Sequence, residues 1–414
     1  MVRRSEEKNP QTEGDLLEPD QVLDDTNPEG TESEEDLGAI DPSLLGRAVV
    51  AGTDWTAETI LSQLAKGNIT LDPAFQRRDA WKQARKSKFI ESIILGLPIP
   101  QLVLAESQEL KGTFIVIDGK QRLLSLQQFA AINLSADQEP LQLNGLLVRK
   151  ELEGKKYSDL QNDPKLAKYL SAFENQPIRT VIVRNWQSEK VLYIIFHRLN
   201  STSVPLSPQE LRQALHPGKF LRFAVEYSET SRGLKKTLRL TKPDFRMRDV
   251  ELLVRYYAYK NFISNYSGNL KEFLDDTCKA LNAQWKTRET QIRQQAEQLE
   301  RAITATFKIF GKGLGFRKWD GKSFERRFNR AVFDIMVYYF SQSAVRNEAL
   351  KSKNKVKAAF QQICADAPAF LRSLETTTKS IEATSLRFSR WGRTLKLVGI
   401  PAQIPRLRPA HRKK

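Results

Sequence analysis

The spacing of apolar residues divides the chain into an N-terminal part that mixes strands with helices and a C-terminal part made of helices. Short runs rich in Val, Ile and Leu at 101–105, 113–117 and 180–184 predict strands. Apolar residues that recur every three or four positions predict helices that bury one face. Such stretches lie at 57–66, 86–96 and 123–131.

From residue 188 onward the pattern predicts helix almost throughout. Ser207-Pro-Gln-Glu210 is a capping box, with Ser207 as N-cap and Glu210 three positions later. Pro368 predicts a break in the last of the amphipathic stretches that follow. These stretches lie at 248–262, 269–282, 284–310, 323–342 and 348–374. The predicted fold class is therefore α+β, with a mainly α-helical C-terminal domain.

The two ends of the chain carry opposite charge. Residues 1–46 hold 14 acidic and three basic side chains, no aromatic residue and no sustained period, so they are predicted to be an acidic disordered leader. The rest of the 414-residue chain has a net charge of +28. This excess favours a nucleic-acid or nucleotide partner, although a generally cationic surface would give the same count.

Residues 381–414 are predicted to form a basic C-terminal tail, because no acidic residue follows Ala383. We expect its cations to contact DNA phosphates. The residues assigned to DNA binding are Arg387, Arg390, Arg393, Lys396, Arg406 and Arg408. The alternative is that the tail packs on its own helices, since it also contains Leu395, Leu397, Val398 and Ile400.

Composition excludes several classes of protein. No run approaches 18 apolar residues, as a transmembrane helix would need, and the first 15 residues contain no apolar segment of a signal peptide. Cys278 and Cys364 are the only cysteines, too few for a disulfide framework or a Cys-rich zinc site. We expect two buried free thiols and a cytoplasmic location. A Walker-type phosphate loop is also absent.

The densest chemical signal directly follows the predicted strand 113–117. Gly119 permits a tight turn, and the start of the next helix offers unpaired N–H groups. Lys120 and Arg122 supply charge for a phosphate, and Asp118 could hold Mg²⁺ or orient water. Asp118 is thus the candidate catalytic residue and metal ligand. A strand–turn–helix joint whose charges face solvent would have the same spacing.

Two further clusters contain side chains that can bind phosphate or bases. Gln76 and Arg77 follow an extended entry fixed by Pro73, and Trp81 can stack on a base or fill the core. Asn200 stands where a predicted helix ends, a position at which Asn is also a common cap. His197 fits an ordinary surface or interface histidine equally well.

In this order along the chain, three motifs resemble the N-terminal domain of GmrSD-type restriction enzymes. They are Phe75-Gln-Arg-x-x-x-Trp81, Ile117-Asp-Gly-Lys-Gln-Arg-Leu123, and Arg198-Leu-Asn200 followed by Leu206-Ser-x-x-Glu-Leu211. The resemblance covers about residues 55–260, including 247–255, and is weaker to about 345. The acid-Gly-Gln-Gln-Arg signature of the family has Lys120 at its third position here.

The resemblance implies a ParB/sulfiredoxin-like domain, which we place at 47–235, followed by a helical domain at 236–380. It also implies nucleotide binding and hydrolysis, coupled to defence against foreign DNA, although Lys120 in the signature leaves hydrolysis open. The expected cofactors are an NTP and Mg²⁺. The phosphate-binding residues would be Gly119, Lys120, Gln121 and Arg122, and the pocket would be completed by Gln76, Arg77 and Asn200.

The family's two-part nucleases carry a second, His-Asn-His nuclease domain, and its pattern is absent after residue 260. We therefore interpret the chain as a nucleotide-binding sensor or regulator whose nuclease, if the system has one, is a separate subunit. Two alternatives stay open: a DNA-binding protein without catalysis, and a stand-alone ParB-like nuclease. The oligomeric state is also left open.

Overall fold

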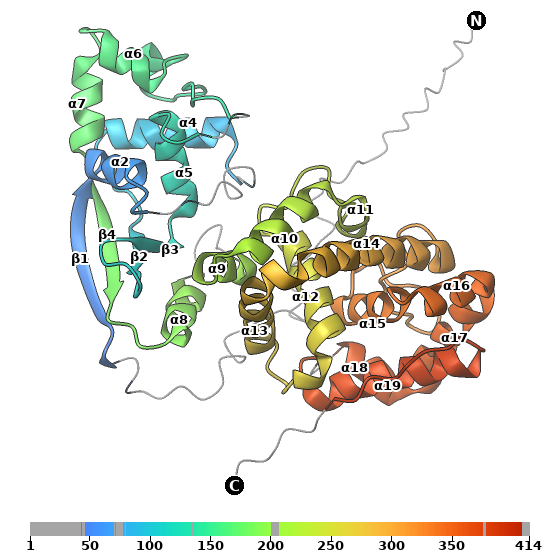
Figure 1. Cartoon of the computed structure of the whole chain (residues 1–414). Coiled ribbons are helices and arrows are strands. Elements are labelled where there is room, and N and C mark those ends of the chain that lie inside the picture. The colour runs from blue at the N-terminus through green and yellow to red at the C-terminus, as the bar shows by residue number, and fades with distance from the viewer. Residues whose placement is uncertain are drawn as a thin grey trace, which may run out of the picture.

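The chain forms an N-terminal lobe built on a sheet and a C-terminal lobe of helices (Figure 1). The computed structural model describes residues 43, 46–69, 71, 78, 80–134, 136, 138–199, 207–375 and 378–407. Helices α8 (Glu189–Leu199) and α9 (Pro208–Leu215) lie between the two lobes. The predicted α+β class, with a helical C-terminal region, is confirmed.

The sheet has four strands in the order β1-β4-β2-β3. Strand β4 (Pro177–Arg184) pairs antiparallel with β1 (Val49–Thr56) and parallel with β2 (Leu102–Glu106). Strand β2 also pairs antiparallel with β3 (Phe114–Asp118). The three predicted strands are confirmed, whereas β1 was not predicted. It is an edge strand whose first two residues, both valines, are exposed. Its apolar and polar residues therefore do not alternate in the way that would indicate a half-buried strand.

Alternate residues of the sheet face two different cores, as the period of a strand requires. Leu102, Leu104 and Val116 pack with the helices of the N-terminal lobe. Val103 and Ile117 point to the other face, which α8 and α9 cover. The helices on the first face are α2 (Ala57–Ala65), α4 (Gln83–Ile94), α5 (Lys120–Phe129), α6 (Tyr157–Asn162) and α7 (Ala167–Asn175), with a 3-10 turn at Lys150–Leu152.

The helical lobe has one continuous core and confirms most of the predicted helices. The stretches predicted at 248–262, 269–282 and 284–310 are helices α12, α13 and α14, within one residue at each end. The full set is α10 (Lys219–Thr230), α11 (Arg232–Leu238), α12 (Arg248–Phe262), α13 (Leu270–Ala283), α14 (Trp285–Phe310), α15 (Arg330–Phe340), α16 (Ser343–Lys351), α17 (Lys353–Asp366), α18 (Pro368–Glu375) and α19 (Ile381–Leu397), with a 3-10 turn at Ile263–Asn265.

Two of the predicted helices differ from the observed ones. The helix predicted at 323–342 begins only at Arg330, because the side chain of Asn329 accepts a hydrogen bond from the N–H of Val332 and so caps α15. The stretch at 348–374 is divided among three helices. One break is the one predicted at Pro368, and the other lies at Ser352.

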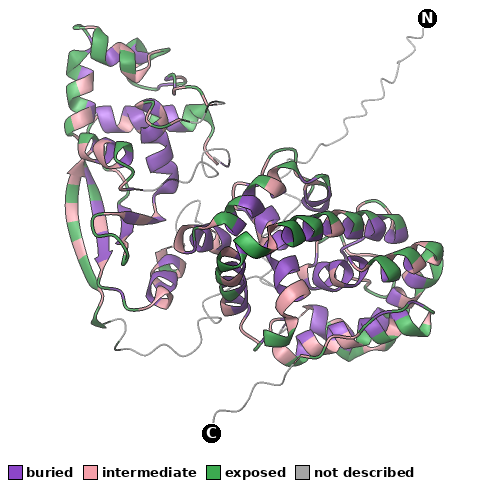
Figure 2. Cartoon of the chain, viewed as in Figure 1, coloured by how far each residue is buried: buried purple, intermediate pink, exposed green. Residues whose placement is uncertain are grey.

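The C-terminal segment from 381 is part of the helical lobe rather than a tail, and its residues pack on the core of that lobe as far as Leu407. Helix α19 packs against α17 and α18, and Figure 2 shows buried positions along these helices. Phe388 and Trp391 of α19 are completely buried. The alternative of a tail packed on its own helices is therefore the observed one. Cys278 and Cys364 are buried free thiols, as predicted. Within the described residues, no helix has both the length and the apolar character needed to cross a bilayer.

Candidate functional site

The turn between β3 and α5 has the geometry that the sequence predicted. Gly119 lies in the left-handed region with φ of 98°, which favours glycine. A Cβ atom at this position would lie 2.4 Å from Cδ2 of Leu102, so packing also requires glycine. Because Gly119 has no side chain to cap α5, the first N–H groups of the helix are left without a side-chain acceptor from the N-cap.

Lys120 is buried at the start of α5 and paired with an acid from α9. Its Nζ donates a hydrogen bond to Oε1 of Glu210, and each side chain is only 4% exposed. The other carboxylate oxygen of Glu210 accepts a 2.7 Å hydrogen bond from the N–H of Ser207, which completes the predicted capping box. The ammonium group of Lys120 is thus bound by the residue that completes the N-terminal cap of α9.

Arg122 is also buried and is held by the end of β3. Its Nη2 lies 2.9 Å from Oδ2 of Asp118 and donates to the carbonyl of Gln101 at 2.9 Å. Its Nε is buried without a hydrogen-bond partner among the described residues. Asp118 is the most exposed member of this group, with 30% of its side chain accessible. It is therefore the acid best placed to meet a ligand.

The motif that ends at Trp81 contacts the same turn, as Glu210 of the third motif does. Oε1 of Gln121 accepts hydrogen bonds from the N–H groups of Ala80 and Trp81, each at 3.2 Å. Arg78, from the same segment, donates to Oδ1 of Asp249 at 2.7 Å, and this ion pair is completely buried. The turn is thereby connected to α12 of the helical lobe. Burial raises the pKa of Asp249 even though Arg78 lies beside it.

The structure brings together part of the predicted site. Asp118, Gly119, Lys120, Gln121 and Arg122 form one turn, and the open alternative in which its charges face solvent is wrong, because Lys120 and Arg122 are buried. Gln76, Arg77 and Asn200 lie outside the described residues.

Trp81 is half-buried and serves the packing of α4. Its ring lies 5.7 Å from that of Phe89, and the guanidinium of Arg85 lies 4.7 Å from its centre.

Of the cations assigned to DNA, Arg387 is the one that the structure places in the core. It is 1% exposed and donates to the carbonyl of Thr378, so its assignment to DNA is wrong. The cause is the helical period, which puts Arg387 on the same face as the buried Trp391. Arg390, Arg393, Lys396 and Arg406 are exposed, and Arg408 lies outside the described residues.

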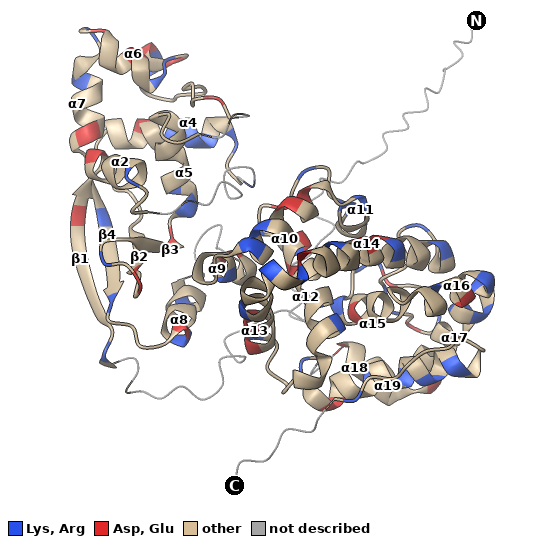
Figure 3. Ribbon diagram, viewed as in Figure 1, with Lys and Arg blue, Asp and Glu red and all other residues tan. Residues whose placement is uncertain are grey.

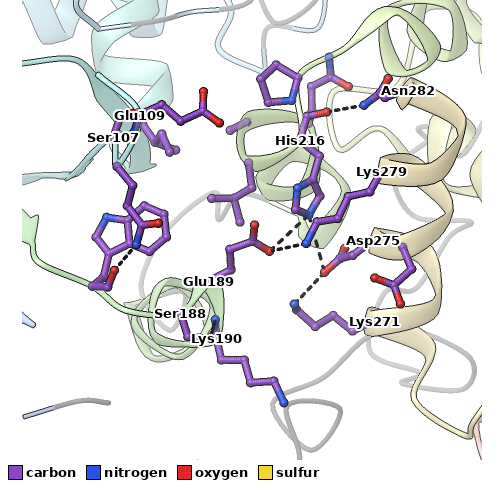
Figure 4. A pocket seen from close by; sticks show the side chains of 18 of the residues that line it. Ser107, Glu109, Ser188, Glu189, Lys190, His216, Lys271, Asp275, Lys279 and Asn282 are labelled. Atoms are coloured by element: carbon purple, nitrogen blue, oxygen red, sulfur yellow. Dashed lines mark hydrogen bonds and ion pairs between the residues drawn. The ribbon is translucent and has the colours of Figure 1, made fainter. Parts of the chain in front are cut away.

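A cavity of about 930 Å³, which the sequence did not predict, lies between the lobes (Figure 4). It is lined by the β2–β3 hairpin, the start of α8, the end of α9 and one face of α13. The charged side chains in its wall are Glu109, Glu189, Lys190, Lys271, Glu272, Asp275, Asp276 and Lys279, together with His216. The turn at 118–122 is not part of this wall.

His216 and two carboxylates form a cluster in the wall of this cavity. Nε2 of His216 lies 3.5 Å from Oε2 of Glu189 and 3.9 Å from Oδ2 of Asp275. Burial alone would raise the pKa of Asp275, but Arg212, His216 and Lys271 together hold it well below its usual range. The three cluster residues are 27 and 59 positions apart, so no local spacing could have indicated them.

Comparison with known families supports the resemblance seen in the sequence. Residues 58–217 match the family model of the GmrSD restriction endonuclease, N-terminal domain. The matched region runs from α2 to the end of α9, and it includes the β3–α5 turn and the Lys120–Glu210 pair. The helical lobe lies beyond it. A search of curated proteins found no match to this chain.

Proposed function

We propose that this chain is the nucleotide-binding sensor or regulator of a restriction-type defence system. The proposal starts from residues 58–217, which match a domain of a restriction endonuclease. In it, an NTP binds at the β3–α5 turn, the helical lobe binds DNA, and a separate subunit cuts the DNA.

The observation that carries the proposal is the group of buried charges around the open start of α5. Asp118, Lys120, Arg122 and Glu210 come together where β3 ends and a helix begins. Buried ion pairs contribute little net stability, because desolvation offsets most of their attraction. Charges gathered beside a helix N-terminus are instead typical of sites that bind phosphate.

The side chains of the turn define what each would do in the complex. Phosphate oxygens would accept hydrogen bonds from the first N–H groups of α5 and from Nε of Arg122, which has no acceptor among the described residues. Lys120 would exchange its bond to Glu210 for one to the phosphate. Asp118 fits Mg²⁺, since this ion is commonly held by one or two carboxylates together with substrate phosphates. If the NTP is hydrolysed, Asp118 is also the residue placed to orient water.

The Lys120–Glu210 pair would connect nucleotide binding to the helical lobe. Glu210 belongs to the capping box of α9, and α9 packs against both β3 and α12. When a phosphate replaces Glu210 as the partner of Lys120, the contact between the N-terminal lobe and α9 is weakened. A change at the nucleotide site would therefore reach the surface that binds DNA.

The helical lobe supports a DNA partner through exposed cations of α19. Arg390, Arg393 and Lys396 lie on a different face of this helix from the buried Trp391. Cations on such an exposed face can neutralise DNA phosphates without any change in packing. Figure 3 shows further Lys and Arg positions on α16 and α17.

Thermal melting with and without nucleotide tests the proposal. A ligand that binds only the folded chain raises its melting temperature, so ATP or GTP with Mg²⁺ should stabilise the wild type. The R179A variant should respond in the same way, because Arg179 is exposed and pairs with Asp54 on the edge of the sheet, away from the turn. A melting temperature that no nucleotide changes at millimolar concentration would contradict it.

A further inference from the structure

We propose that Glu189, His216 and Asp275 form a binding site for a divalent transition-metal ion of the zinc type, open to the cavity between the lobes. The three side chains come from three different elements: the first residue of α8, the residue that ends α9, and the middle of α13. They converge in the close view of the cavity (Figure 4). This inference does not depend on the proposed function.

The donor atoms are already near the spacing that such an ion needs. One ligand atom from each residue can be chosen so that all three lie within 4.8 Å of one another. Bonds of about 2.0–2.1 Å in a tetrahedral zinc site place neighbouring ligand atoms about 3.3 Å apart. Two of the observed separations are 3.5 and 3.9 Å, so small side-chain movements would suffice.

The state of His216 is a second, independent indication of a ligand. Its side chain is only 4% exposed, and its Nε2 faces the two carboxylates at 3.5 and 3.9 Å without a hydrogen bond of ordinary geometry. Burying a polar atom at such long distances from its acceptors is costly, and native structures leave few buried polar atoms poorly satisfied. A metal ion bound at Nε2 would remove this cost, because the neutral imidazole nitrogen is a common metal ligand.

The donor set selects the class of ion. One imidazole nitrogen and two carboxylate oxygens suit Zn²⁺ and related transition metals, whereas Mg²⁺ and Ca²⁺ prefer oxygen ligands alone. Three protein ligands leave a fourth position, which here faces a cavity of about 930 Å³. Such an open position takes water or a small ligand, as in zinc sites that are not purely structural.

Neighbouring side chains hold two of the ligands in place. Nε of Arg212 donates to Oδ1 of Asp275 at 2.7 Å, which leaves Oδ2 facing His216. Nδ2 of Asn282 donates to the carbonyl of His216 at 3.0 Å and fixes the end of α9. Contacts of this kind orient ligands and raise metal affinity.

Two lysines form ion pairs with the ligand carboxylates and would compete with the metal ion for them. Nζ of Lys271 donates a hydrogen bond to Oδ2 of Asp275 at 2.7 Å. The same carboxylate oxygen has a second lone pair, which can bind the metal. Lys279 lies 3.4 Å from Oε2 of Glu189 and has 51% of its side chain exposed, so it can turn away into solvent. Replacing Lys279 with a neutral residue should therefore strengthen metal binding.

The test is calorimetric titration of ZnCl₂ into the full chain after chelation and desalting, with MgCl₂ as the comparison. We expect one zinc ion per chain and much weaker binding of Mg²⁺. H216Q and E189Q should each weaken zinc binding by at least about tenfold. H197Q is the matched control and should bind as the wild type does, since His197 lies at the far end of α8 and does not line the cavity. K279M should bind more tightly than the wild type.

Co²⁺ allows a spectroscopic measurement that is independent of calorimetry. Co²⁺ bound in the site should give visible absorption bands that H216Q loses and H197Q keeps. If H216Q does not fold, E189Q carries the test, because Glu189 is at the surface end of a helix. The proposal is overturned if the wild type shows no saturable zinc binding, or if H216Q or E189Q binds zinc as tightly as the wild type, which would mean an adventitious ion.

Discussion

Lys120 at the start of α5 forms a buried ion pair with Glu210 of α9, a residue 90 positions later in the chain. Each side chain belongs to a different sequence motif, and each also shapes the local backbone: Lys120 is the first residue of its helix, and Glu210 completes a capping box. The pair therefore joins the candidate nucleotide site to the helix that covers the other face of the sheet.

Replacing Glu210 with Gln should separate stability from nucleotide affinity. The variant removes the negative charge from a buried ion pair, which should lower the free energy of unfolding by about 3 kcal/mol. It should also strengthen nucleotide binding, because the charge of Glu210 no longer competes with a phosphate for Lys120. Guanidinium unfolding and nucleotide titration measure the two effects. The control is E58Q, which alters an exposed acid in the first turn of α2. Weaker nucleotide binding by E210Q would contradict the proposed exchange.

Trp391 should be essential to the helical lobe, contrary to what a basic tail would imply. The side chain is completely buried, with its ring 5.3 Å from that of Phe360. W391A should lower the free energy of unfolding by about 3–5 kcal/mol, as other large core truncations do. R393A changes an exposed residue of the same helix and should have little effect. Denaturant unfolding would show equal stability for both variants if the segment were a tail.

Exposed cations of α19 should contribute affinity for DNA of any sequence. Removing one cation that binds a phosphate reduces the slope of log affinity against log salt by about 0.9 on duplex DNA. The triple variant R390A/R393A/K396A should therefore flatten this slope by about 2–3 while the melting temperature is kept. A filter-binding or anisotropy series over several salt concentrations gives the slope. An unchanged slope would remove this face of α19 from the DNA interface.

The purified chain alone, with Mg²⁺ or Mn²⁺, should leave plasmid DNA intact. The pattern of a His-Asn-His nuclease is absent after residue 260, and Asp118 is engaged by Arg122. Gel analysis after long incubation measures any cleavage. Cleavage that follows the protein through purification, and that D118A loses, would instead favour the stand-alone nuclease.

Local sequence predicted those features of the fold that depend on neighbouring residues. Periodic apolar positions indicated the long helices, and runs of Val and Ile indicated three of the four strands. The capping box at Ser207 was predicted because its two residues are three positions apart. Strand β1 was missed because its burial depends on pairing with β4, more than a hundred residues away.

The candidate site was predicted in its composition but not in its contacts. The five residues from Asp118 to Arg122 are adjacent in sequence, so their turn could be inferred. Their acidic partner Glu210, and the partner of Arg78 on α12, are set by tertiary packing over 90 and 171 residues. Charge alone could not separate the buried Arg387 from its exposed neighbours, although its spacing of four from Trp391 carried that information.

Calorimetric titration of ATP and GTP, each with Mg²⁺, into the wild-type chain and R122A tests nucleotide binding at the β3–α5 turn most directly. A charge-assisted bond to phosphate is worth about 1.5–3 kcal/mol, so R122A should bind the preferred nucleotide about 10- to 150-fold more weakly. R179A should bind as the wild type does, and circular dichroism should show that all three proteins are folded. We predict saturable binding of one nucleotide per chain. A wild type that binds neither nucleotide, or a folded R122A that binds with unchanged affinity, would contradict the proposed site.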